Sequence, residues 1–267
     1  MHDVPRKIER RLFRISTGKL SSEGSVSQSV FITGVSSGIG FGLAQEYLRR
    51  GDVVYGVSRR TPDGLVGDNF HFLSLDLCDT ANVQSSLPKF LPANTNLDAV
   101  VLNAGILGSI GDMKDTSIAE MKQTMDINVW SCKTVLDALI HHCSIKNVIS
   151  ISSGAAVNGN RGWNGYSISK AALNMLTSLY ARENPDIHFA AVAPGLVDTA
   201  MQDYLCGHVS DPRFPSLETL KSRRGTDEMP KPDILAKKLV SLFDSVEKHV
   251  ESGGFVDVRH LPEFSQW

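Results

Sequence analysis

A short apolar run, a glycine-rich turn and a helical pattern follow one another between residues 30 and 48. Val30-Phe-Ile comes first, Thr33-Gly-Val-Ser-Ser-Gly-Ile-Gly40 follows, and apolar residues then recur at helical spacing as far as Leu48. A buried strand, a tight turn and an amphipathic helix in this order begin a βαβ unit. Glycines let such a turn approach a ligand closely, and the first amides of the helix face an anion. The segment therefore predicts a strand-to-helix turn that can hold a phosphate group.

Apolar runs and helical patterns alternate through the rest of the chain. Further strands are predicted at 53–57, 71–75, 97–102, 147–151, 187–192 and 254–258, and helices at about 118–143, 166–182 and 233–248. Strands that are apolar throughout, separated by helices, indicate a parallel sheet with both faces covered. Because crossovers between parallel strands are right-handed, we expect a single α/β Rossmann domain, a doubly wound parallel sheet with helices on both faces.

The composition is that of an ordinary soluble globular protein. The 267 residues are 42% hydrophobic and carry a formal net charge of −2, which suits one large domain and argues against nucleic-acid binding. No apolar run is long enough to span a membrane, so we expect no membrane association. The cysteines at 78, 132, 143 and 206 lack the spacing of metal or disulfide sites, which favours a reducing, cytoplasmic environment and no metal.

Residues 1–28 differ from the rest of the chain. Basic residues outnumber acidic ones there, and a stretch rich in Ser and Gly extends from Ser16 to Ser29. Such a segment suits an organelle transit sequence, a flexible tail or an upstream start of the reading frame. We favour a tail over targeting and expect the globular domain to span residues 29–267.

Tyr166 and Lys170 are four residues apart on a predicted helix, so their side chains share one face. A neighbouring ammonium group favours the phenolate and lowers the pKa of a tyrosine, which would make Tyr166 usable as an acid near neutral pH. Ser153, thirteen residues upstream, can hold a carbonyl oxygen by a hydrogen bond while Tyr166 transfers the proton. By itself the Tyr-Lys spacing also arises by chance on amphipathic helices.

Several short motifs occur in a fixed order along the chain. The Gly-x-x-x-Gly-x-Gly turn is followed by Asn103-Ala-Gly105, Asn128, Ser153, Tyr166, Lys170 and Pro194-Gly195. In this combination the chain resembles the short-chain dehydrogenase/reductase family over about residues 30–258. The stretches 103–108, 193–201 and 251–257 are most similar to the branch that contains sepiapterin reductases and benzil (diketone) reductases.

The resemblance implies a catalytic tetrad of Asn128, Ser153, Tyr166 and Lys170. Tyr166 would be the acid/base, Ser153 would orient the substrate, and Lys170 would lower the phenol pKa and bind the nicotinamide ribose. Asn128 would hold a water between Lys170 and solvent, although a satisfied buried amide explains an Asn at this position equally well. Ser152 competes with Ser153, because adjacent residues on a strand point to opposite sides. The family's interval between Ser and Tyr favours Ser153.

The resemblance also implies a dinucleotide cofactor. We expect Gly34 to permit the tight turn, Gly38 to let the backbone approach the pyrophosphate and Gly40 to allow close helix packing. On the family's pattern the other contacts are Ser36, Ser37, Ile39, Asp76, Leu77, Asn103, Ala104, Gly105, Tyr166, Lys170, Pro194, Gly195, Val197 and Thr199.

The choice between NAD and NADP depends on the end of the second strand. An NAD enzyme places an acid there, whereas this chain reads Val57-Ser-Arg-Arg60. A guanidinium group suits a 2′-phosphate, so we predict NADP(H) with Arg59 as the main contact and Arg60 assisting. The alternative is that both arginines are solvated surface charges.

The substrate is less well defined by the sequence. Residues 200–230 follow the nicotinamide loop and are expected to form a substrate lid. Trp163 and Met201 can wall an apolar pocket, or they can merely pack the lid. Asp257 matches the position at which sepiapterin reductases anchor a pterin. Together with Ser153, these residues are the predicted substrate contacts.

These expectations lead to an NADPH-dependent carbonyl reductase that acts on a small ketone, an α-dicarbonyl or a pterin side chain. The alternatives are an NADP-dependent alcohol or steroid dehydrogenase working oxidatively, and a catalytically idle protein that senses dinucleotides. From the resemblance we expect a homodimer or homotetramer, assembled through the helices that begin near Ile118 and Tyr166.

Overall fold

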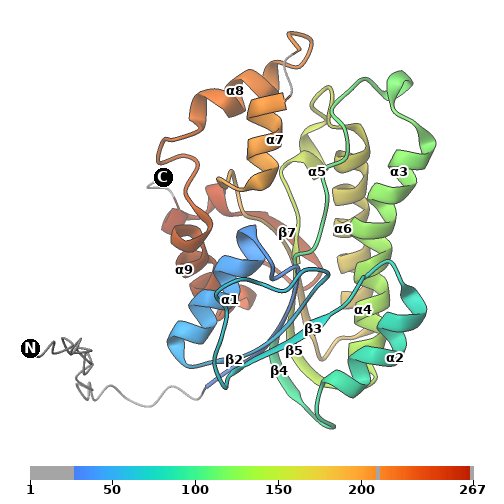
Figure 1. The fold of residues 1–267 in the computed structure, drawn as a ribbon, viewed down its shortest axis with the longest axis vertical. Coiled ribbons are helices and arrows are strands. Elements are labelled where there is room, and N and C mark those ends of the chain that lie inside the picture. The colour runs from blue at the N-terminus through green and yellow to red at the C-terminus, as the bar shows by residue number, and fades with distance from the viewer. Residues whose placement is uncertain (1–26, 209–210, 265–267) are drawn as a thin grey trace, which may run out of the picture.

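The structure is a computed structural model in which residues 27–208 and 211–264 are described. Seven parallel strands form one sheet in the order β3-β2-β1-β4-β5-β6-β7 (Figure 1). The strand order reverses between β1 and β4, which is the switch point at which doubly wound sheets bind ligands. The strands are β1 Ser29–Thr33, β2 Val53–Ser58, β3 Phe70–Ser74, β4 Asn96–Leu102, β5 Ser144–Ile151, β6 His188–Ala193 and β7 Gly254–Asp257.

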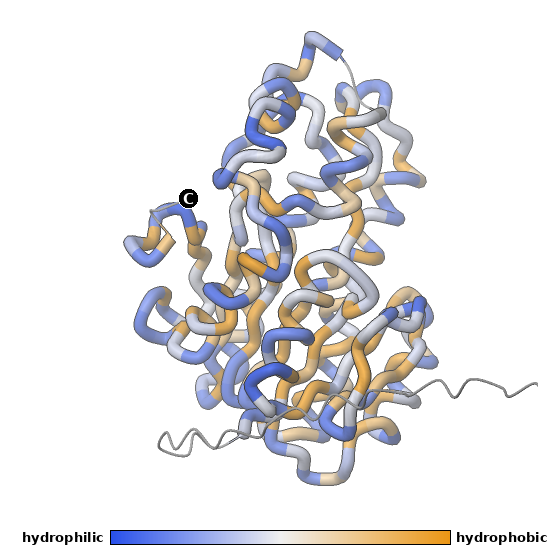
Figure 2. Tube along the Cα trace, turned by 60° about the vertical axis from the view of Figure 1, so that its left-hand side comes forward, coloured by the Kyte–Doolittle hydropathy of each residue, from blue (hydrophilic) through white to orange (hydrophobic). Residues whose placement is uncertain are grey.

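Helices cover both faces of the sheet, as predicted. α1 (Gly38–Arg50) and α9 (Pro232–Phe243) pack together on one face. α2 (Thr80–Phe90), α4 (Ser131–Ile140) and α6 (Asn164–Glu183) cover the other. Figure 2 shows the apolar residues gathered along the strands and between these two layers. The fold is therefore the doubly wound α/β Rossmann arrangement.

The helix predicted at about 118–143 is divided into three parts. α3 (Ile118–Met125) leads into η2 (Asp126–Trp130), a π-helical turn, and α4 then continues to Ile140. A π turn inserts one extra residue into an α-helix without changing its apolar pattern greatly, so the sequence does not reveal it. The turn carries Asn128 to the buried side of the segment.

Several shorter elements lie in the connections. The expected lid region contains α7 (Ala200–His208) and α8 (Pro215–Arg223), and α5 (Ala155–Asn158) follows β5. The helix expected at 233–248 ends at Phe243. The remaining turns are η1 Met113–Asp115, η3 Val246–Lys248, η4 Val258–His260 and η5 Pro262–Phe264.

The predicted tail of residues 1–28 falls largely outside the described residues. Ser27 and Gln28 nevertheless belong to the fold, since the Ser27 hydroxyl donates to the Gly51 carbonyl and the Gln28 amide donates to Asp52. Within the part of the chain that the structure describes, none of the helices is both long and apolar enough to cross a membrane.

Candidate active site

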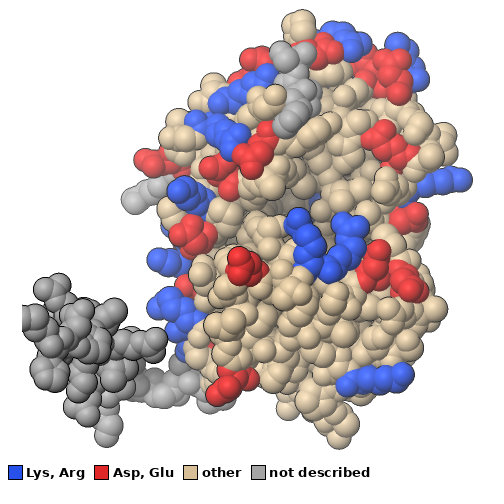
Figure 3. Space-filling model, viewed as in Figure 1, with Lys and Arg blue, Asp and Glu red and all other residues tan. Residues whose placement is uncertain are grey.

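A cleft of about 410 Å³ opens where the strands end at their carboxyl edge. Its walls come from the turns after β1, β2 and β4, from α6, and from α7 and α8. Figure 3 shows the hollow between the lid helices and the body of the molecule, with basic side chains at its rim. The switch point of the sheet thus lies at the base of this cavity.

The glycine-rich turn forms the floor of this cleft. Gly34 and Gly38 adopt φ angles of 77° and 61°, which favour glycine. A Cβ on Gly40 would lie 2.4 Å from the Gly34 carbonyl oxygen, so Gly40 lets the turn fold on itself. The same Cβ would lie 2.4 Å from the Asn103 Nδ2, so Gly40 allows the close packing of the helix that we expected; Gly42 allows a further close approach, since a Cβ there would lie 2.7 Å from the Pro232 carbonyl oxygen.

The first turn of α1 is available to an anion. Its N-cap residue, Ser37, makes no side-chain capping bond, and no acidic residue lies in that turn. Free amides and the positive end of the helix dipole therefore face the cleft without a competing carboxylate. Thr199 lies opposite, since its Cγ2 is 3.5 Å from the position of a Cβ on Gly38.

Asn103 fastens the turns after β1 and β4 to each other. Its side-chain amide donates to the carbonyl oxygens of Thr33 at 2.9 Å and Gly34 at 3.3 Å. Its backbone amide and that of Ala104 donate to the Thr33 hydroxyl. Ala104 and Gly105 continue along the cleft wall. Asn103 thus stabilises the sheet edge on which the cofactor would lie.

Arg59 and Arg60 follow β2 at one end of the cleft, and both are exposed. Their backbone carbonyls accept hydrogen bonds from the Ser74 and Ser58 hydroxyls, at 3.0 and 2.7 Å. These bonds fix the backbone of the turn and leave the two guanidinium groups free to project. Asp76, the acid on the neighbouring turn, accepts from the Cys78 amide. The end of the cleft therefore carries two exposed cations.

The structure separates the two adjacent serines. Ser152 is buried and donates to the Asn174 side chain at 2.5 Å, whereas Ser153 lines the cleft together with Tyr166. Another hydrogen bond, from Thr177 to Ser150, joins the same strand to α6 at 2.8 Å. β5 and α6 are thereby held in register with Ser153 beside Tyr166.

The pKa of Tyr166 is raised rather than lowered. Burial raises it, and the hydrogen bond with Ser153 offsets this only in part. We expected the Lys170 ammonium group to lower it. That group instead donates to the Ile151 carbonyl at 2.7 Å and lies 5.8 Å from the centre of the Tyr166 ring, and burial is the main influence on the Tyr166 pKa. Tyr166 therefore keeps its proton well above neutral pH.

Lys170 is itself buried. Desolvation lowers its pKa to about 8, although the nearby Cys132 acts in the opposite direction. Its Nζ lies 3.7 Å from the position of a Cβ on Gly105, so this glycine makes room for the ammonium group at the cleft wall. Lys170 is thus a cation at neutral pH that is close to losing its proton.

Asn128 is fully buried in η2 and does not line the cleft. Its Oδ1 accepts from the Ile106 amide at 2.7 Å, and its Nδ2 donates to the Ile106 carbonyl at 2.8 Å and the Ser169 hydroxyl at 2.9 Å. This is the geometry of a satisfied buried amide, which ties the loop after β4 to the helix of Tyr166. The water-holding role stays a prediction.

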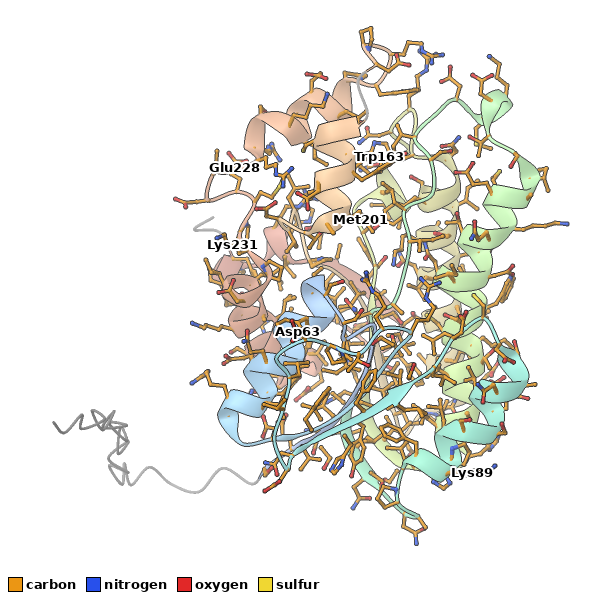
Figure 4. All side chains as sticks on the ribbon, viewed as in Figure 1. Asp63, Lys89, Trp163, Met201, Glu228 and Lys231 are labelled. Atoms are coloured by element: carbon orange, nitrogen blue, oxygen red, sulfur yellow. The ribbon has the colours of Figure 1, made fainter. Side chains whose placement is uncertain are left out.

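The lid side of the cleft is apolar. Trp163 and Met201 both line it and pack against a small cluster of buried lid residues, so each is a wall of the cavity and a lid contact at once. Figure 4 shows them between the lid helices and the carboxyl edge of the sheet. The Trp163 indole N–H donates to Ser216 on α8 at 2.8 Å. The cluster of buried lid residues against which Trp163 and Met201 pack consists of Leu107, Leu205, Phe214, Leu217, Leu220 and Met229.

Asp257 does not reach the cleft, in contrast to the sequence expectation. It is buried, and its carboxylate accepts from the Arg259 Nε at 2.9 Å and from the Arg259 backbone amide at 3.1 Å. Burial raises the pKa of Asp257, but the bonds with Arg259 outweigh it and hold the pKa below its usual range. The pair packs behind Gly154 and Gly195, so Asp257 supports two loops of the site.

The cleft gathers most of the predicted residues and several that the sequence analysis missed. Only Gly40, Asn128 and Asp257 among the predicted site residues are not in its lining. The newly found lining residues include Ser58, Ile106, Leu196, Gln202 and Leu205. Leu205 carries a usable signal, because it stands four residues after Met201 on a helix that borders the cleft.

A doubly wound sheet with a glycine-rich anion site and a Ser-Tyr pair in one cleft defines a dinucleotide-dependent oxidoreductase fold. The profile of the short chain dehydrogenase family matches residues 28–207. The chain therefore belongs to the short-chain dehydrogenase/reductase family.

Individual relatives agree with this assignment. Benzil reductase ((S)-benzoin forming) of Saccharomyces cerevisiae is 32% identical over 192 residues, which cover 65% of this chain and 73% of that protein. Sepiapterin reductase of Bos taurus is 33% identical over 177 residues, covering 62% and 64%. A crystal structure of a short-chain dehydrogenase/reductase from S. cerevisiae superposes with a TM-score of 0.77 at 23% identity, covering 90% and 99%. The resemblance to the benzil and sepiapterin reductase branch is thus confirmed.

Proposed function

We propose that this protein is an NADPH-dependent carbonyl reductase that acts on a ketone or α-dicarbonyl substrate. The observation that carries the proposal is that Ser153 and Tyr166 line the same cleft as the glycine-rich turn. These two hydroxyls can meet one carbonyl oxygen, and the anion site on the same floor can hold a dinucleotide. The similarity to a benzil reductase supports the substrate class.

The residues at the far end of the cleft fit a dinucleotide with a 2′-phosphate. The first turn of α1 offers free amides to a pyrophosphate, and Arg59 and Arg60 offer two exposed guanidinium groups beyond it. An arginine binds a phosphate by paired N–H donors, and no carboxylate of the chain engages either arginine in the described hydrogen bonds and ion pairs. We therefore assign NADPH rather than NADH as the preferred cofactor.

The chemistry divides between the cofactor and the side chains of the cleft. Bound NADPH supplies a hydride for the carbonyl carbon. Ser153 holds the carbonyl oxygen by a hydrogen bond, and Tyr166 gives its phenolic proton to that oxygen as negative charge develops there. The C=O π bond is replaced by one C–H and one O–H bond. Lys170, beside Tyr166, keeps a positive charge near the phenolate that is left.

The raised pKa of Tyr166 favours reduction over oxidation. A reductase needs the protonated phenol, and burial keeps Tyr166 protonated across the neutral range. An alcohol dehydrogenase would need the phenolate as a base, which the same burial disfavours. The apolar lid suits a hydrophobic carbonyl compound, whereas no carboxylate faces that side to anchor a pterin. Since all four cysteines are free, we also propose the cytoplasm as the compartment.

The proposal is tested by following NADPH oxidation with benzil, sepiapterin and simple ketones, using wild type and the variants Tyr166→Phe and Arg59→Ala. We expect turnover of the diketone in the wild type. Tyr166→Phe should lose turnover at least about 100-fold, which is the lower range for general acid catalysis, and still bind NADPH. Arg59→Ala should weaken NADPH binding while leaving NADH binding within about twofold.

Three results would contradict the proposal. Turnover retained by Tyr166→Phe would remove that residue from the chemistry. Faster oxidation of alcohols than reduction of carbonyls, at matched concentrations, would favour the oxidative dehydrogenase. Tight NADPH binding without turnover of any substrate would favour a dinucleotide-sensing protein.

A further inference from the structure

Polar groups are scarce on the substrate side of the cleft. The charged residues of the lining are Arg59, Arg60, Asp76 and Lys170; the first three lie at the cofactor end and Lys170 lies behind Tyr166. Toward the lid, the walls are Ile106, Trp163, Leu196, Met201, Leu205 and Leu220. The Trp163 indole N–H is already bonded to Ser216. One further polar side chain, Gln202, lines the cavity there.

Gln202 lies in the first turn of α7 and is 8% exposed. Its Oε1 is enclosed and has no hydrogen-bond partner among the described residues. Leu205, three residues later on the same face of the helix, also lines the cavity. A polar atom such as this oxygen, when buried without a partner, costs free energy, so native proteins rarely keep one unless the side chain meets a ligand or a water. The side chain is therefore a polar group built into an otherwise apolar wall.

The geometry points to Gln202 as the residue that recognises the second oxygen of an α-dicarbonyl substrate. Ser153 and Tyr166 share the oxygen of the carbonyl that is reduced, and a simple ketone has no other polar atom. A vicinal diketone has a second carbonyl oxygen one bond farther on, and this oxygen needs an N–H donor. The Gln202 carboxamide can turn its Nε2 toward that oxygen by rotating about its terminal bond. This inference rests on the proposed reductase function.

The Gln202 amide would also discriminate between two chemically similar substrate classes, vicinal diketones and monoketones. For a diketone, the N–H bond offsets the cost of removing the second oxygen from water. For a ketone without that oxygen, the amide stays unpaired in a cavity lined by apolar side chains. Selectivity for diketones over monoketones should thus depend on Gln202, while proton transfer by Tyr166 should not.

The test compares benzil with deoxybenzoin, which lacks only the second oxygen. Dissociation constants for both ligands are measured by equilibrium dialysis with NADP⁺ present, so that no turnover is required, and kcat/KM is measured separately with NADPH. The proteins are wild type, Gln202→Leu, Gln202→Met as a second apolar replacement of similar length, and the control Gln84→Leu, which removes an exposed glutamine from α2. NADPH affinity is followed by fluorescence titration.

We expect each Gln202 variant to weaken benzil binding and lower its kcat/KM by about tenfold, with deoxybenzoin and NADPH changed less than about twofold. Equal losses for both ligands would assign Gln202 to packing, and a loss confined to NADPH would assign it to the cofactor; either result overturns the inference. A ratio of benzil to deoxybenzoin affinity that is the same in the Gln202 variants as in wild type would also overturn the inference. If wild type binds benzil but never reduces it, the reductase function fails, and the dialysis ratio still decides the role of Gln202.

Discussion

Lys170 shows how one buried side chain couples function to stability. Removing its ammonium group from water costs free energy, which appears as a pKa lowered from 10.5 to about 8. The hydrogen bond to Ile151 recovers only part of that cost. In the proposed mechanism the position next to Tyr166 needs a cation, so the fold would carry a residue that destabilises it for the sake of that role.

This coupling predicts a pH-dependent gain in stability for Lys170→Met. Below about pH 8 the folded protein must hold a buried ammonium group. Between about pH 8 and 10.5 the unfolded chain binds more protons than the folded one, so the free energy of unfolding of wild type rises with pH. The variant should be more stable by roughly 1 to 3 kcal/mol near pH 7, and this advantage should shrink near pH 10.

Urea unfolding of both proteins at the two pH values measures the difference. Lys133→Met serves as the control, since the Lys133 side chain is 51% exposed on α4 and its replacement should give little change at either pH. An advantage of Lys170→Met that stays constant with pH would contradict the explanation. The variant should also lose reductase turnover.

At the scale of single residues, the spacing of side chains along the sequence predicts those contacts that local backbone geometry determines. Tyr166 and Lys170 meet because a helix brings residues four apart together, and Ser153 reaches them because parallel strands end at a common edge. The raised pKa of Tyr166 was not predictable in this way, because desolvation depends on segments that pack over it from elsewhere in the chain. Gln202 was missed for the same reason: only the folded structure shows that its amide lacks a partner.

The lid is held by a charged junction at the level of elements. Asp112, in the loop after β4, accepts from the Arg161 Nε and Nη2 at 2.6 and 2.8 Å and pairs with Arg213, just before α8, at 3.0 Å. Both guanidinium groups lie near the aromatic ring of Phe214, with their carbons 6.0 and 5.2 Å from its centroid. Hydrogen bonding to Arg161 holds the pKa of Asp112 below its usual range. Three segments thus meet at one carboxylate.

Asp112→Asn should loosen the lid without affecting the cofactor end. We expect the KM for the carbonyl substrate to rise roughly two- to fivefold, because solvent-exposed ion pairs contribute little each. Amide hydrogen exchange in α8 should become faster, and NADPH affinity should stay the same. The matched control is Asp115→Asn, since Asp115 pairs with its neighbour Lys114 only in the described ion pairs. Equal effects of both replacements on α8 would contradict the junction.

Elements differ in how well the sequence predicts them. All seven strands were predicted to within a few residues, because a strand buried on both faces is apolar throughout. α7 and α8 were expected only as a lid, since each is short and depends on packing against the other and on the Trp163 region. The π turn at 126–130 was not predicted, because an insertion of one residue leaves the helical apolar pattern nearly intact.

On the whole molecule, an apolar stripe on one side suits contact with a second copy of the chain. Met175 and Leu179 on α6 are 60% and 49% exposed, and Trp130 at the end of η2 is 50% exposed. Ile168 lies on the same helix, seven residues before Met175. These residues sit on the helices from which the family resemblance predicts assembly. We therefore propose a homodimer or homotetramer in which this stripe is covered.

Replacing Met175 with Lys should shift the protein toward monomers, because an ammonium group would be buried in the contact. Size-exclusion chromatography with light scattering measures the mass of wild type and variant at several concentrations. Val66→Lys is the control, as Val66 is 83% exposed on a loop between β2 and β3. A wild type that is monomeric at high concentration, or a Met175→Lys protein of unchanged mass, would contradict the proposed contact.

The parallel arrangement of the sheet also has a practical consequence. All seven strands start at one edge and finish at the other, and the cleft lies beyond the finishing edge. β1, with which the sheet portion begins at Ser29, is five residues long, so its start is about 16 Å from the cleft floor. A dye, an affinity handle or a bead attached at the exposed residue Ser27 therefore lies at the opposite pole. When the protein is immobilised in this way, small molecules should still reach the cleft.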